Sequence, residues 1–123
     1  MKISSNNYNR GEINEFLKST GWKLEGAETQ TYGAEFRDRI ISSMADEAAR
    51  LGGDSGELRE CLEILSKDEY DIPLYAERAK FEGKDAWIII IDRRGPVLKG
   101  GLQHLRVYVW GIRDRKVLYS AGG

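Results

Sequence analysis

The fold is decided by the stretch Ala86–Asp92, which reads Ala-Trp-Ile-Ile-Ile-Ile-Asp. Four isoleucines after a tryptophan leave no polar face, and β-branched and aromatic residues at this density favour a strand over a helix. The run is too short to span a membrane as a helix, for which about 20 apolar residues are needed. A strand that is apolar on both faces belongs in the middle of a sheet, with helices covering at least one side.

The composition is typical of one ordinary globular domain. Of its 123 residues, 41% are hydrophobic and 32% are charged, and we interpret residues 1–123 as a single domain. The N-terminal segment has no apolar signal region. The only cysteine, Cys61, cannot form an internal disulfide and lies on the apolar stripe of a predicted helix. These features predict a cytoplasmic protein that does not bind a membrane.

The charges are distributed unevenly along the chain. Residues 1–70 carry 9 basic and 14 acidic side chains, a net charge of −5, whereas residues 71–123 carry 10 and 6, a net charge of +4. Either the two parts attract each other within the fold, or the basic part binds an anionic partner. The total charge of −1 disfavours nucleic acid as that partner without excluding it.

The first half of the chain is predicted to be helical. We expect residues 1–9, which are polar, to be disordered and residues 10–66 to form the helical part of the domain. Apolar stripes at three- and four-residue spacing and capping residues define three helices. They cover Arg10–Thr20, Ala34–Leu51 and a segment that follows the capping residue Asp54.

The second half, residues 74–120, is predicted to form a four-stranded antiparallel meander. Two glycine-containing segments and the hairpin turn Ile112–Arg115 separate the four apolar stretches. These strands are Leu74–Phe81, Ala86–Asp92, Gln103–Gly111 and Lys116–Ser120.

Three N-terminal helices on such a sheet give a two-layer α+β domain. We expect the helices to cover the face of the third strand that carries Leu105, Val107 and Val109. The layout resembles that of cystatin-like and NTF2-like cone folds, in which helices pack against a curved sheet. The resemblance concerns layout alone and implies no particular site.

The opposite sheet face is the predicted working surface. It combines arginine with aromatic residues, as interaction surfaces do, and a glycine-rich basic loop lies beside it. The candidate partner- or ligand-binding residues are Arg93, Arg94, Lys99, His104, Arg106, Tyr108 and Trp110. We interpret the chain as a small soluble interaction domain that binds an acidic protein partner or a second copy of itself.

Motifs of the common enzyme classes are missing from the sequence. It has one histidine, which excludes a multi-histidine metal site, and it has no Gly-x-Ser-x-Gly motif, phosphate-binding loop or Cys-x-x-Cys pair. We therefore predict no catalytic residues, no metal and no cofactor.

Two alternatives remain open. The first is a small-ligand-binding or hydrolytic cone-fold protein, in which His104 meets Asp92, Asp85 or Glu77 and acts as a general base. The second rests on the terminal Gly122-Gly123, which resembles the tail of ubiquitin and the bacterial sulfur carriers. That resemblance implies a carrier whose terminal carboxylate is adenylated by an activating enzyme.

Overall fold

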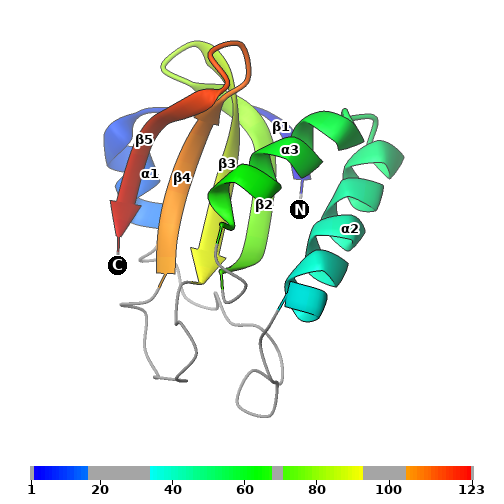
Figure 1. Ribbon diagram of the computed structural model, residues 1–123. Helices are drawn as coiled ribbons and strands as arrows, with labels where there is room; N and C mark the ends of the chain where they lie inside the picture. The colour runs from blue at the N-terminus through cyan, green and yellow to red at the C-terminus, as the bar shows by residue number, and fades with distance from the viewer. Residues whose placement is uncertain (1, 17–33, 68–70, 93–104, 123) are drawn as a thin grey trace.

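The computed structural model describes residues 2–16, 34–67, 71–92 and 105–122. Within these residues, five strands form one sheet and three helices pack against it (Figure 1). The strands are β1 (Lys2–Tyr8), β2 (Ile72–Phe81), β3 (Lys84–Asp92), β4 (Leu105–Gly111) and β5 (Lys116–Gly122). The helices are α1 (Arg10–Phe16), α2 (Ala34–Arg50) and α3 (Ser55–Leu65).

The sheet is mixed, with strand order β1-β2-β3-β4-β5. β1 pairs with β2 in parallel, and the other three pairs are antiparallel. The predicted four-stranded antiparallel sheet is therefore wrong, and Lys2–Tyr8, within the segment predicted to be disordered, form a strand. The physical reason is that β1 is a polar strand, so the hydrophobic pattern that identifies strands is missing from it.

The central position of β3 is confirmed. It lies between β2 and β4, and every residue from Ala86 to Asp92 is buried. Trp87, Ile89 and Ile91 belong to one apolar cluster, while Ile88 and Ile90 belong to another. A strand with two apolar faces thus separates two cores.

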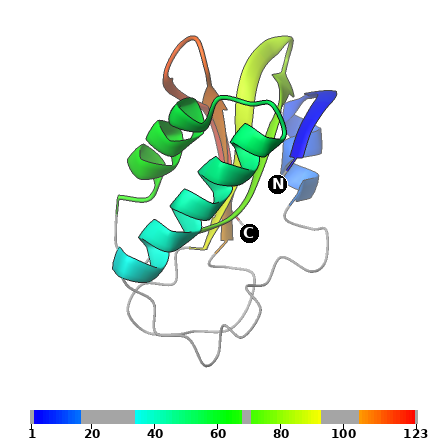
Figure 2. The ribbon, with the colours of Figure 1, turned by 90° about the vertical axis from the view of Figure 1, so that its right-hand side faces the viewer.

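The helices are divided between the two faces of the sheet. α2 and α3 cover one face and α1 covers the other, as Figures 1 and 2 show together. α1 buries Ile13 against Leu105, Val107 and Val109, whereas α2 and α3 pack on Trp110. The predicted two-layer arrangement is wrong because Tyr108 and Trp110 on one side of β4 are buried, as are Leu105, Val107 and Val109 on the other.

The helix starts that the sequence indicates are confirmed. Asn9 and Glu12 form a capping box in which Asn9 N donates to Glu12 Oε1 at 3.1 Å and Glu12 N donates to Asn9 Oδ1 at 2.9 Å. The Asp54 side chain caps α3 by accepting from Glu57 N at 2.9 Å. After α2, Gly52 adopts a positive φ of 90°, which a helix end of this kind requires. Among the described helices, none has the length and apolarity that crossing a membrane demands.

Candidate binding site at Glu77

Four of the residues predicted to form the working surface lie outside the described residues: Arg93, Arg94, Lys99 and His104. The other three are on β4. Arg106 is exposed, but Tyr108 and Trp110 are only 8% and 5% exposed. The two rings pack in one cluster with side chains of α2 and α3. At Tyr108 and Trp110 the face is therefore core, and these two rings are not exposed to a partner.

The residues of the two alternatives are only partly described. His104 is outside the described residues, and the three carboxylates considered as its partners occupy different environments. Asp92 and Glu77 are buried, each with 1% of its surface exposed. Asp85 is exposed, and its Oδ1 atom lies 3.8 Å from Arg78 Nη1. For the carrier alternative, Gly122 is the last residue of β5, and Gly123 is not described.

Glu77 is a carboxylate in the core-facing row of β2. Because side chains alternate along a strand, Tyr75, Glu77 and Ala79 share the face that α1 covers. Burying a charged carboxylate is costly unless hydrogen bonds and charges compensate for the lost water. The surroundings of Glu77 therefore have to supply donors.

β1 supplies three of these donors. Ser4 Oγ donates to Glu77 Oε2 at 2.6 Å, Tyr8 Oη at 2.8 Å and Asn6 Nδ2 at 3.2 Å. The three donors are two residues apart, so they point to the same face of β1. These hydrogen bonds from Ser4, Asn6 and Tyr8 to Glu77 Oε2 help to hold the polar strand β1 at the sheet edge.

The second oxygen of Glu77 has partners of its own. Tyr75 Oη donates to Glu77 Oε1 at 2.7 Å, and Lys2 Nζ lies 3.9 Å from the same oxygen. Burial alone would raise the pKa of Glu77, but hydrogen bonds from Ser4, Tyr75, Tyr8 and Asn6 together lower the pKa below its usual range. Glu77 is consequently an anion at neutral pH.

The same contacts act in the opposite direction on the two phenols. Burial and the hydrogen bond to Glu77 raise the pKa of Tyr8 to about 12. Burial and the bond to the same carboxylate also raise the pKa of Tyr75. Both phenols remain protonated across the physiological range and keep donating to Glu77.

A cavity of about 490 Å³ opens beside this network. α1, β1 and β2 contribute its described lining, which consists of Lys2, Tyr8, Glu12, Glu15, Phe16, Tyr75 and Glu77. The ring of Tyr8 meets that of Phe16 edge-on at 5.1 Å, and Phe16 lies 6.3 Å from Tyr75. Three contiguous aromatic rings and a buried anion from three elements thus converge on one space.

The network is poorly suited to acid–base or nucleophilic catalysis. A general base needs a free lone pair and a pKa near the working pH, whereas Glu77 already accepts four hydrogen bonds and has a lowered pKa. Elsewhere, burial raises the pKa of the Cys61 thiol well above its ordinary value. Over the described ranges, no group of three or more His, Cys, Asp or Glu residues is placed to hold a metal ion.

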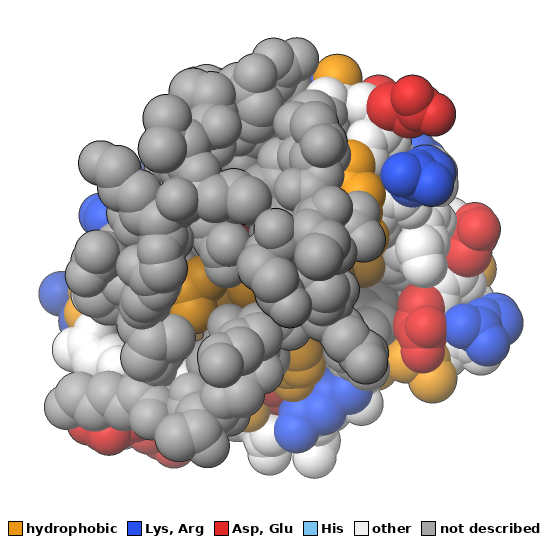
Figure 3. All heavy atoms as spheres, turned by 90° about the horizontal axis from the view of Figure 1, so that it is seen from below, with side chains coloured by type: hydrophobic (Ala, Val, Ile, Leu, Met, Phe, Trp, Pro, Cys, Tyr) orange, Lys and Arg blue, Asp and Glu red, His pale blue; other side chains and the backbone are white. Residues whose placement is uncertain are grey.

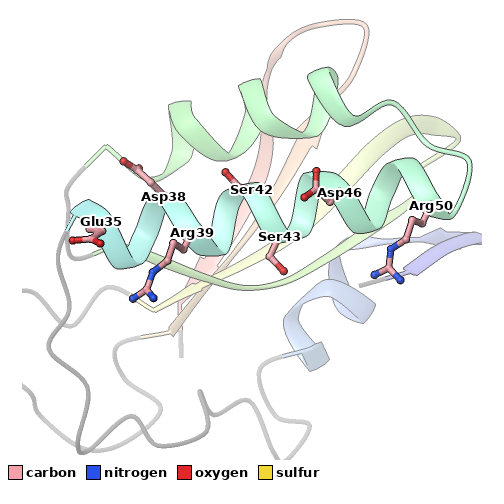
Figure 4. Close-up of a pocket in the computed structure, with 7 residues that line it drawn as sticks. All are labelled: Glu35, Asp38, Arg39, Ser42, Ser43, Asp46 and Arg50. Atoms are coloured by element: carbon pink, nitrogen blue, oxygen red, sulfur yellow. The ribbon is translucent and has the colours of Figure 1, made fainter.

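A larger hollow of about 910 Å³ runs along α2. Its described lining comes from this helix alone and consists of Glu35, Asp38, Arg39, Ser42, Ser43, Asp46 and Arg50. In Figure 4, Arg39, Ser43 and Arg50 point to one side of α2, whereas Asp38 and Ser42 point to the other. Figure 3 shows both signs of charge mixed along the side of the molecule that α2 forms. The side chains do not converge on a ligand, so this hollow is the weaker candidate.

The sequence interpretation missed Glu77 as a binding-site centre, although it considered this residue as a partner for His104. The signal was its position: Glu77 occupies the same alternating row as Ala79 and Phe81, where an apolar residue is expected. The three donors from β1 could not be identified from the sequence because they lie about 70 residues before Glu77. Comparisons of the chain with protein-family models, curated proteins and solved structures find no match.

Proposed function

We propose that the protein is a binding domain without catalysis of its own and that the cavity beside Glu77 is its recognition site. One observation carries this proposal: a fully buried, ionised carboxylate orients two phenols that line an open cavity. Binding pockets commonly combine an apolar lining with a few convergent polar groups. The rings of Tyr8, Phe16 and Tyr75 supply the apolar part here, and Glu77 fixes two of them.

The chemistry of the cavity supports binding over reaction. The protons of Tyr8 and Tyr75 are held by Glu77, and their pKa values are raised rather than brought close to neutral pH. A preorganised array of this kind costs little to reorganise when a ligand enters, which favours affinity. It does not offer the free base or the activated nucleophile that turnover requires.

The proposed interaction role keeps part of the interpretation made from the sequence and moves its site. A protein partner, a second copy of the chain or a small ligand remains the expected class of partner, within the cytoplasm. The contact surface moves from the face of Trp110, which α2 and α3 cover, to the face that carries α1.

Amide NMR spectra test the proposal with probes of different chemistry: n-butylamine, acetate, n-butanol and phenol. At least one probe should shift amide signals in β1, α1 and β2, and Phe16→Trp should weaken that binding by filling part of the cavity. Asp46→Asn, on the exposed side of α2, is the matched control and should change nothing. The proposal fails if no probe shifts these signals, or if the shifts concentrate on α2.

A further inference from the structure

The cavity beside Glu77 has the chemistry of a cation site. Its described lining carries three carboxylates, Glu12, Glu15 and Glu77, against the single ammonium of Lys2. Walls of one sign focus the electrostatic potential inside a cleft and attract ligands of the opposite sign. An anionic ligand would be repelled from this space.

The aromatic rings strengthen the same preference. Ammonium and guanidinium groups bind over the faces of Tyr, Trp and Phe, and several rings around one space form the usual recognition site for alkylammonium groups. Tyr8 and Tyr75 each donate a proton to Glu77. A phenol that donates to a carboxylate is polarised by it, so the ring and the oxygen of each tyrosine become more electron-rich.

Lys2 shows that an alkylammonium reaches this site. Its Nζ lies 3.9 Å from Glu77 Oε1, although the lysine side chain is 55% exposed. A lysine that is more than half in solvent makes a weak ion pair. The chain therefore places a loosely held ammonium group of its own where a ligand ammonium would bind.

We propose that the cavity binds an alkylammonium group and that Lys2 is a displaceable internal competitor for it. This inference rests on the proposed binding function and adds the ligand class. The ammonium would come from a free amine or from a lysine side chain of a partner protein, since both present the same head group.

Calorimetric titration of the whole chain tests the inference with n-butylamine and its uncharged analogue n-butanol. We expect butylammonium to bind about tenfold more tightly, in keeping with the strength of partly desolvated cation–π contacts. Lys2→Met should tighten butylammonium binding about threefold by removing the competitor, and Glu15→Gln should weaken it by a similar factor. Asp46→Asn is the control and should leave both affinities unchanged.

The outcomes separate the two proposals. Equal affinity for butanol and butylammonium would overturn the cation inference and leave the binding function standing, whereas no binding of either compound would count against both. Unchanged butylammonium affinity in Lys2→Met would overturn the role of Lys2. A short acetylated peptide with one central lysine then identifies the source: tighter binding than butylammonium indicates a partner protein, and weaker binding indicates a free amine.

Discussion

The two faces of the sheet are closed in different ways. α2 and α3, with 17 and 11 residues, cover the face of Trp87, Ile89 and Ile91 with an apolar layer. α1, described over Arg10–Phe16, covers the opposite face, where the apolar cluster ends at the buried carboxylate of Glu77. The comparison indicates that one face is built for stability, while the other gives up apolar packing at its β1 edge and gains a polar cavity.

The face under α2 and α3 should tolerate no charge at its centre. Ile89→Asp places a carboxylate where the side chain is completely buried in an apolar cluster. The cost should be at least about 5 kcal/mol, which is comparable to the whole stability of a small domain. Circular dichroism should show no cooperative thermal transition, and Ile89→Val, the control, should lose only about 1 kcal/mol. A melting curve like that of the wild type would mean that β3 is not the central strand.

Two residues of β4 should differ sharply in their contribution to stability. Trp110→Ala removes a ring that is 5% exposed beneath α3 and should cost about 3 to 5 kcal/mol. Arg106→Ala changes an exposed side chain and should cost less than about 0.5 kcal/mol. Urea denaturation measures both. A stable Trp110→Ala variant that loses a binding partner would restore the surface role predicted from the sequence.

The α1 face should depend on the charge of Glu77. Glu77→Gln replaces an oxygen that accepts by an amide group that donates toward Ser4, Asn6 and Tyr8, so we expect a loss of about 2 to 3 kcal/mol. Hydrogen exchange should accelerate in β1 more than in β3, because β1 loses its side-chain anchors. Glu82→Gln is the matched control, since Glu82 is exposed and pairs only loosely with Arg10 at 3.8 Å. Equal exchange of β1 in both variants would show that Glu77 does not hold the strand.

The smallest expected effect is a pH dependence confined to the α1 face. The folded pKa of Glu77 is lowered from 4.5, so its contribution is present above that pH and is lost as the pH falls through the folded pKa. The stability difference between the wild type and Glu77→Gln should therefore shrink below pH 4.5. Urea titrations across this range measure it, and a constant difference would contradict the lowered pKa.

Much of the fold was predictable because its signals are local. Four successive isoleucines require a strand with two buried faces wherever it lies in the sheet. Gly52 marks the end of α2 through its positive φ, and Asp54 marks the start of α3 through its capping side chain. Both signals act within a few residues. These features depend on neighbouring residues alone, so a sequence pattern is enough to identify them.

The features that the sequence did not predict depend on contacts between residues far apart in the chain. Both alternating rows of β4 contain large apolar residues, so the pattern cannot decide which row meets α2 and α3. β1 has no apolar stripe, and the acceptor that its Ser4, Asn6 and Tyr8 side chains share, Glu77, lies far along the chain. The candidate site was missed for the same reason, since a cavity between α1, β1 and β2 is a property of their packing.

The most direct test is a ¹³C NMR titration of the Glu77 side-chain carboxyl in the folded protein. We expect its pKa below 4.5, and we expect Ser4→Ala and Tyr75→Phe to shift that pKa upward because each removes one donor. A folded-state pKa at or above 4.5 that neither variant changes would contradict a buried anion held by β1 and Tyr75, and with it the binding site built around that anion.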